Sequence, residues 1–212
     1  MSTHMRWFSR VSIGLALLSL IFIGCAEPPT DGIQAAKIAL ADAQAAEAER
    51  YASNAFEQAT AALAKADKAV TEQNKKFALT RDYTQAKQLI EAAHKAAQNA
   101  KTTAMTNRER ARTETERLLA QIENAIMETK ALVASAPKDK ALKPALDECN
   151  NDLTMTEAAL ADVKMVESTG DYLKAKSQAT TAFASASSTK DELQQAIAKY
   201  TESLAAKKRK RA

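Results

Sequence analysis

The side chains with the most versatile chemistry in this sequence are two cysteines, Cys25 and Cys149, and two histidines, His4 and His94. Thiols and imidazoles can ligate a metal or act as nucleophile and base, but these four lie far apart and show no metal-ligand spacing. The sequence also shows no Gly-rich phosphate loop and no nucleophile elbow, and its carboxylates are interspersed with Lys and Arg. We therefore expect no enzymatic activity, no cofactor and no metal.

Cys25 stands at the end of a short apolar segment. Arg6 and Arg10 precede an apolar run over residues 11–24, which is shorter than the roughly 20 residues that cross a bilayer. A cationic flank, a short apolar core and small residues at its end are typical of a secretory signal peptide. The run ends in LIFIGC at residues 20–25, which resembles the lipobox of bacterial lipoproteins. This resemblance implies cleavage before Cys25 and acylation of its thiol.

Two other outcomes remain open at this end of the chain. Cleavage after Ala26, with the small residues Gly24 and Ala26 at the positions that an ordinary signal peptidase reads, would release a soluble protein. An uncleaved segment would act as a signal anchor. If Cys25 is acylated, attachment is effectively permanent, since each buried methylene contributes about 0.8 kcal/mol. The resemblance to lipoproteins also implies that Ala26, which is not Asp, favours the outer membrane of a Gram-negative envelope, with the protein facing the periplasm.

The rest of the chain has the composition of a helical protein. Alanine, the best helix former, is abundant, whereas the 212 residues include only four Gly and four Pro, and aromatic residues make up 5%. Turn formers and strand formers are therefore scarce, which excludes sandwiches, barrels and α/β enzymes. We expect an all-α protein built from long antiparallel coiled-coil hairpins. Narrow seams of Ala also leave little room for a pocket.

Apolar residues at alternating three- and four-residue steps predict four long helices. The first covers residues 33–78, with Ile38 and a series of alanines on its seam, and the second covers residues 82–134. Pro137 and Pro144 bracket a loop. The third and fourth helices follow over residues 144–168 and 171–206. Cys149 falls on the seam of the third helix, so we expect a small core residue, with a redox or nucleophilic thiol as the alternative.

These helices define the expected organisation of the chain. Residues 1–24 form the signal peptide, and residues 25–32, with two Pro and one Gly, form a flexible tether. Residues 33–135 form a first helical hairpin, residues 136–206 a second, and residues 207–212 a basic tail. The pattern does not decide between two separate hairpins and one four-helix bundle, and Ala seams also suit self-association.

The two hairpins carry similar turns. TRDYTQAK at residues 80–87 parallels TGDYLKAK at residues 169–176. We expect Asp82 and Asp171 to cap the returning helices and Tyr83 and Tyr172 to begin their apolar seams. An Ala-rich helix, a polar turn with Asp-Tyr and a second Ala-rich helix behind a lipoprotein signal resemble an uncharacterised family of helical-hairpin domains, a domain of unknown function found in bacterial envelope proteins. The resemblance implies a fold and a compartment but no reaction.

The excess of positive charge lies in the C-terminal tail. The chain carries a net charge of +4, which becomes +2 without Arg6 and Arg10 and −3 when the tail is also removed. An exported chain with this distribution is not expected to bind nucleic acid. The tail either solubilises the end of the last helix or contacts peptidoglycan, another anionic polymer or lipid. Its basic residues are Lys207, Lys208, Arg209, Lys210 and Arg211.

Two functions follow from these features. The first is a structural or scaffolding lipoprotein of the cell envelope, held by Cys25 and reaching an anionic surface through its tail. The second is an accessory binding subunit of an envelope complex that docks through a helix face. Residues 108–117 are the candidate face, because they carry charged pairs at four-residue spacing such as Arg112 and Glu116. A solvated face on a continuous helix is the simpler interpretation of the same residues.

Overall fold

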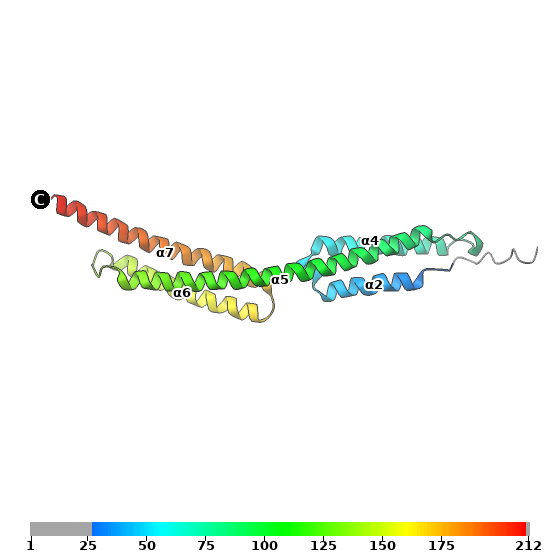
Figure 1. The fold of residues 1–212 in the computed structure, drawn as a ribbon, viewed down its shortest axis with the longest axis horizontal. Helices are drawn as coiled ribbons and strands as arrows, with labels where there is room; N and C mark the ends of the chain where they lie inside the picture. The colour runs from blue at the N-terminus through cyan, green and yellow to red at the C-terminus, as the bar shows by residue number, and fades with distance from the viewer. Residues whose placement is uncertain (1–26, 211–212) are drawn as a thin grey trace, which may run out of the picture. The chain divides into compact units, whose positions relative to one another are not determined.

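The computed structural model describes residues 27–210, and every regular element in that range is helical (Figure 1). The chain is therefore all-α, as its composition predicts. The expected signal peptide lies outside the described residues. The elements are α2 (Thr30–Ala45), α3 (Ala48–Tyr51), α4 (Ser53–Asn74), the 3₁₀ turn η2 (Ala78–Thr80), α5 (Thr84–Ser135), α6 (Lys143–Ser168) and α7 (Tyr172–Arg209).

The chain divides into two compact units, residues 1–104 and residues 105–212. The first contains α2, α3, α4 and the first part of α5, and the second contains the rest of α5 with α6 and α7. The sequence places the boundary between hairpins at residue 135 instead. The difference arises because the two parts of α5 pack against different helices, so each unit is a bundle of three helices rather than a hairpin.

The core of the first unit is built from small residues of three helices. Ala36 of α2, Ala66 of α4, and Ile90 and Ala93 of α5 are all buried in one cluster. The Lys101 ammonium of α5 donates to the Asp42 carboxylate of α2 at 2.9 Å. Gly32 lies against Ile90, and Asp42 pairs with Lys101 further along both helices, so α2 and α5 run in the same direction. Helix α4 connects them and runs antiparallel to both.

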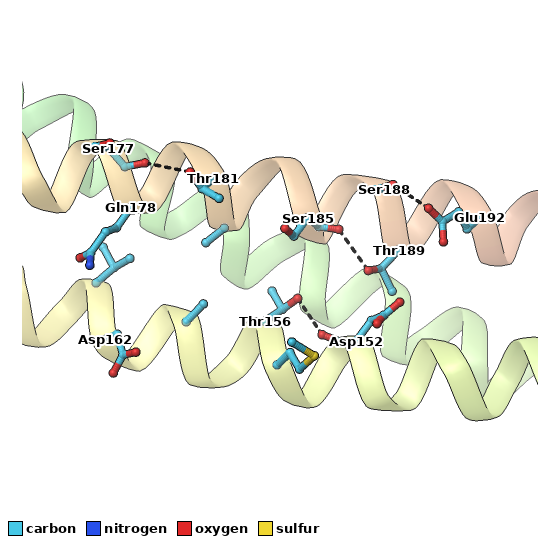
Figure 2. Close-up of a pocket in the computed structure, with 14 residues that line it drawn as sticks. Asp152, Thr156, Asp162, Ser177, Gln178, Thr181, Ser185, Ser188, Thr189 and Glu192 are labelled. Carbon is cyan, nitrogen blue, oxygen red and sulfur yellow. Dashed lines mark hydrogen bonds between the residues drawn. The ribbon is translucent and has the colours of Figure 1, made fainter.

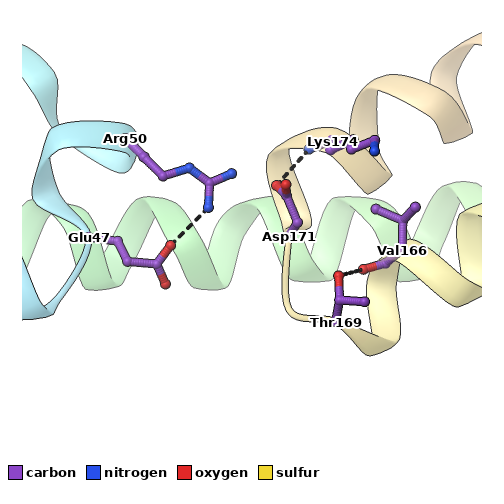
Figure 3. Close-up of polar contacts among 6 residues, drawn as sticks. All are labelled: Glu47, Arg50, Val166, Thr169, Asp171 and Lys174. Atoms are coloured by element: carbon purple, nitrogen blue, oxygen red, sulfur yellow. Dashed lines mark hydrogen bonds and ion pairs between the residues drawn. The ribbon is translucent and has the colours of Figure 1, made fainter.

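The prediction of one helix over residues 33–78 is wrong, because the chain reverses between α2 and α4. Glu47 adopts a left-handed conformation with φ 58°, and its carboxylate accepts a hydrogen bond from Arg50 at 3.0 Å (Figure 3). Left-handed backbone costs a non-Gly residue about 1–2 kcal/mol. The reversal buries a stripe of α2 in return, so the packing of distant segments outweighs local helix propensity. This stripe consists of Ala36, Ala39 and Ala43.

The reversal also changes which face of the first helical segment is buried. Ile38, which the sequence places on the apolar seam, is 55% exposed. The guanidinium of Arg50 lies over the ring of Tyr51, 5.7 Å from its centroid, and Tyr51 is buried at the turn. The buried face of α2 is therefore the face that contacts α4 and α5. It is not the single apolar seam that the sequence predicts.

The second unit has a core of larger side chains. Helices α6 and α7 form the predicted antiparallel hairpin, within a few residues of the expected bounds. Ion pairs at the surface connect α5 to both helices of this hairpin. Lys164 of α6 donates to Glu123 at 2.6 Å, and Lys190 of α7 donates to Glu128 at 2.9 Å. The buried core members are Leu118, Leu119, Ile122, Ile126, Cys149, Leu153, Val163, Val166, Ala175, Ala179, Ala182 and Leu193.

The two similar turns cap helices as the sequence predicts. The backbone N–H of Thr84 donates to Asp82 at 2.8 Å, and that of Lys174 donates to Asp171 at 3.2 Å (Figure 3). Hydrogen bonds from the Thr84 hydroxyl and amide hold the pKa of Asp82 below its ordinary value. Tyr83 is buried at the start of the α5 seam. Each Asp therefore satisfies an amide in the first turn of the returning helix.

Replacement of Ala66 by Leu tests the small-residue core of the first unit. Ala66 is completely buried among α2, α4 and α5, so the larger side chain should overpack the interface and lower the free energy of unfolding by about 1–3 kcal/mol. Ala64→Leu is the matched control, since Ala64 is exposed on the same helix and should change stability by less than about 0.5 kcal/mol. Urea unfolding followed by circular dichroism measures both, and equal losses would contradict the three-helix packing.

Candidate functional site

The lipidation residue expected from the sequence, Cys25, lies outside the described residues. The structure shows where the helical body begins after it. Helix α2 starts at Thr30, and the N–H of Ile33 donates to the carbonyl of Pro29. Residues 30–32, which the sequence places in a flexible tether, therefore belong to the first helix, and residues 26–29 alone separate Cys25 from it.

The basic tail is the terminal part of α7. Lys207, Lys208 and Arg209 occupy its last turn and Lys210 follows, whereas Arg211 lies outside the described residues. All residues from 201 to 210 are exposed. Cations at the carboxyl end of a helix interact favourably with its dipole. The described part of the tail thus presents four cations on a helical extension open to solvent.

The polar segment at residues 108–117 forms part of the uninterrupted helix α5. The Arg112 guanidinium lies 3.4 Å from the Glu109 carboxylate and 3.6 Å from the Glu116 carboxylate. One side of the segment nevertheless faces the core, because Thr115 is completely buried and its hydroxyl donates to the Ala111 carbonyl at 2.8 Å. The segment is therefore a packed helix with one charged side.

Helix α7 supplies the partner of a second acidic residue in this segment. The Lys176 ammonium pairs with the Glu114 carboxylate, and this hydrogen bond holds the pKa of Glu114 below its ordinary value. Arg110 lies four residues before Glu114 on the same helix, and its positive charge lowers the pKa of Glu114 further. Only the packing of α5 against α7 brings the Lys176 side chain to this carboxylate.

Cys149 is buried in the core of the second unit, as its position on the helical seam predicts. Burial raises the pKa of its thiol, and the negative charges of Asp152 and Glu192 raise it further. Because the thiolate is the nucleophilic form, a raised pKa lowers the reactivity expected of the Cys149 thiol. Its role in the described structure is to fill space between helices.

Helices α6 and α7 enclose an open groove of about 570 Å³ (Figure 2). The sequence predicts little room for a pocket, and this prediction is wrong for the outer side of this hairpin. The groove exists because α7 presents small Ser, Thr and Ala side chains there while α6 contributes Met155 and Ala159 at its walls. Small side chains facing each other across two helices leave a trough between the backbones.

The polar groups of the groove are carboxylates, hydroxyls and the side-chain amide of Gln178. Asp152, Asp162 and Glu192 line it, and Ser188 donates its hydroxyl proton to Glu192 at 2.7 Å (Figure 2). The buried Oε1 of Gln178 has no hydrogen-bond partner among the described residues. Other hydroxyls use their protons within their own helices. Those of Thr156, Thr181 and Thr189 donate to the carbonyls of Asp152, Ser177 and Ser185.

The three carboxylates along the groove suit the binding of a polar or cationic group. Within residues 27–210, no cluster of three His, Cys, Asp or Glu side chains is arranged to hold a metal ion. His94 lies on α5 with its Nε2 3.5 Å from the Gln98 amide nitrogen.

No helix within the described range combines the length and the apolar character that crossing a bilayer requires. Comparison of the chain with protein-family models, with curated proteins and with solved structures finds no match. The class that the structure itself defines is an all-α protein of two three-helix units, with an exposed basic helix end and a polar groove.

The reactivity of Cys149 tests the burial of its thiol. We expect alkylation of Cys149 in the folded protein to be at least about tenfold slower than in urea, because the thiol is buried and its pKa is raised. Peptide mass mapping after timed exposure to iodoacetamide measures the alkylation of Cys149 separately from that of Cys25. Met155→Cys, which places a thiol on an exposed position of the same helix, should react quickly in the folded state. Equal rates at both positions would contradict the core placement.

Proposed function

We propose that this protein is a lipid-anchored structural or scaffolding protein of the bacterial cell envelope. The observation that carries the proposal is the LIFIGC sequence at residues 20–25, behind a cationic flank and directly before a helical body. In this proposal Cys25 is the acylated N-terminal residue and residues 26–29 connect it to α2, which begins at Thr30. The acyl chains hold the protein on the outer membrane and the helices extend into the periplasm.

The helical units support a role that depends on shape. Helix α7 alone contains 38 residues, which corresponds to a length of about 57 Å at about 1.5 Å per residue. Residues 201–210, the end of this helix and the residue that follows it, are exposed and carry four cations. A helix of this length places those cations well away from the core at Leu193. They are therefore available to peptidoglycan or to another anionic polymer of the envelope.

A second candidate function is an accessory subunit that binds an envelope protein. The observation in its favour is the groove between α6 and α7, with three carboxylates along its walls. A cationic helix with small side chains would fit its size and charge. In this alternative the tail contributes little to localisation, and a defined protein partner is recovered with the full chain.

Cys25→Ala tests the anchor. The unmodified protein should carry a mass increment that matches its acyl chains and should fractionate with membranes. The variant should lack the increment and move to the soluble fraction, because a short tether alone gives no affinity for lipid. Intact-mass spectrometry and membrane flotation measure the two properties. A protein without acyl chains in the soluble fraction would show that cleavage occurs after Ala26 and would overturn the proposal.

The basic tail is tested by replacing Lys207, Lys208, Arg209 and Lys210 with Gln. Cosedimentation with purified peptidoglycan should fall by more than about tenfold, since a cation near an anionic surface contributes about 1 kcal/mol. The effect should shrink as salt rises. The matched control neutralises four exposed lysines elsewhere in the second unit and should leave cosedimentation unchanged. These control positions are Lys138, Lys140, Lys174 and Lys199. Unchanged binding by the tail variant would favour the accessory-subunit function.

A further inference from the structure

The connection between α4 and α5 presents two large apolar side chains to solvent. Phe77 is 72% exposed and Leu79 is 66% exposed, and only Ala78 separates them in the sequence. We call residues 75–81 the tip loop. Single exposed apolar residues are common on protein surfaces, but an aromatic and an aliphatic side chain on the same tight turn form a local apolar protrusion.

The tip loop is held in place by its polar groups. The Arg81 guanidinium donates to the carbonyls of Asn74 and Lys76 at 3.1 and 3.0 Å, which closes the end of α4. The N–H of Thr80 donates to the Phe77 carbonyl at 2.9 Å. These three hydrogen bonds hold the loop against the end of α4. The apolar side chains point outward from an ordered turn, so their exposure is a feature of the folded unit.

The tip loop lies at the end of the first unit where α2 begins (Figure 1). Pro29 and Gly32 line a surface groove together with Lys87 and Ile90, near the start of α5. The tip loop directly precedes that part of α5. Helix α2 starts at Thr30, five residues after Cys25. Cys25 is therefore at most about 17 Å from the start of α2, the length of five extended residues. Any lipid on Cys25 is therefore restricted to this end of the unit.

The charges around the tip loop also suit a membrane surface. Lys75 and Lys76 are exposed and precede Phe77 directly, and Lys75 lies 2.9 Å from Glu72. Lysines beside apolar side chains are typical of segments that enter the interfacial region, because the ammonium remains among the headgroups while the apolar groups enter the acyl boundary. The occupant that these features favour is a phospholipid bilayer.

We propose that Phe77 and Leu79 insert into the interfacial region of the same bilayer that holds the acyl chains of Cys25. This inference rests on the proposed lipid anchor. An acylated residue on a short tether limits the distance between the first unit and the membrane but leaves the orientation of the unit free. A second apolar contact at the tip loop fixes the orientation of the unit, so that its three helices point away from the membrane.

A unique fluorophore at the tip loop tests this contact. The sequence contains one Trp, Trp7, which lies in the expected signal peptide, so cleaved protein has no other. The Phe77→Trp variant is expressed with its signal peptide, so that the cell can process it. The purified mature protein is then reconstituted into vesicles of phosphatidylethanolamine and phosphatidylglycerol, where its tryptophan emission should be blue-shifted. Brominated acyl chains should quench that emission at least twofold. Asn54→Trp is the matched control, because Asn54 is exposed at the start of α4, the end of that helix opposite the tip loop, and its emission should not be quenched.

The outcomes distinguish the proposed tip-loop contact from the proposed lipid anchor at Cys25. Intact mass and flotation first establish whether the variant carries acyl chains and is bound to the vesicles. Acylated protein that floats with an unquenched Phe77→Trp fluorophore would overturn the tip-loop contact and leave the anchor intact. Protein without acyl chains that does not float would overturn the anchor and, with it, this inference. Leu79→Trp provides a second probe of the same loop if circular dichroism shows that Phe77→Trp is misfolded, and the same criterion then applies to it.

Discussion

Close packing of alanines is the constraint on which the first unit depends. Ala43, Ala48, Ala66, Ala100 and Ala104 are completely buried, so the helix surfaces at these points consist of little more than backbone and methyl groups. Small interfacial residues allow helices to approach toward the short end of the usual 8–10 Å range. Each alanine buries little area, so the stability of the unit depends on the number of such contacts. A larger side chain at any of these positions has no space to occupy.

The second unit uses the same connectivity with larger side chains. Ile122, Val163 and Leu193 are fully or almost fully buried there, and ion pairs follow the edges of the three helices. Exposed pairs of this kind contribute little individually, with a median near 0–1 kcal/mol. Their pattern is still informative, because Glu123 pairs with α6 and Glu128 with α7. They favour one register of the helices, while apolar burial supplies most of the stability.

The features on which the proposed functions depend lie outside these cores. The tether and the tip loop are at one end of the first unit, and the basic residues occupy the exposed end of α7 in the second. The groove between α6 and α7 is the described feature best suited to a cationic partner. Membrane attachment, surface contact and partner binding would therefore use different residues. The helical cores position these residues and take no direct part in the proposed interactions.

Much of this architecture can be read from local signals in the sequence. The scarcity of Gly and Pro and the abundance of Ala specify helices, and Pro144 and the Asp-Tyr turns mark where α6, α5 and α7 begin. Cys149 is on an apolar seam in the sequence and in the core of the structure. These features are predictable because helix propensity, capping and apolar periodicity act over one or two helical turns.

The reversal at Glu47 was decided by tertiary structure. No Gly or Pro interrupts residues 33–78, and alanine favours helix throughout, so no local signal marks the turn. The chain turns because folding α2 back buries its Ala stripe against α4 and α5, and that gain comes from residues far away in the sequence. Long-range packing also decides that Ile38 faces solvent and that α5 serves two units, whereas small side chains on facing helices leave the groove between α6 and α7. Local propensity determined that the chain is helical, and long-range packing determined where its helices turn and which faces remain open.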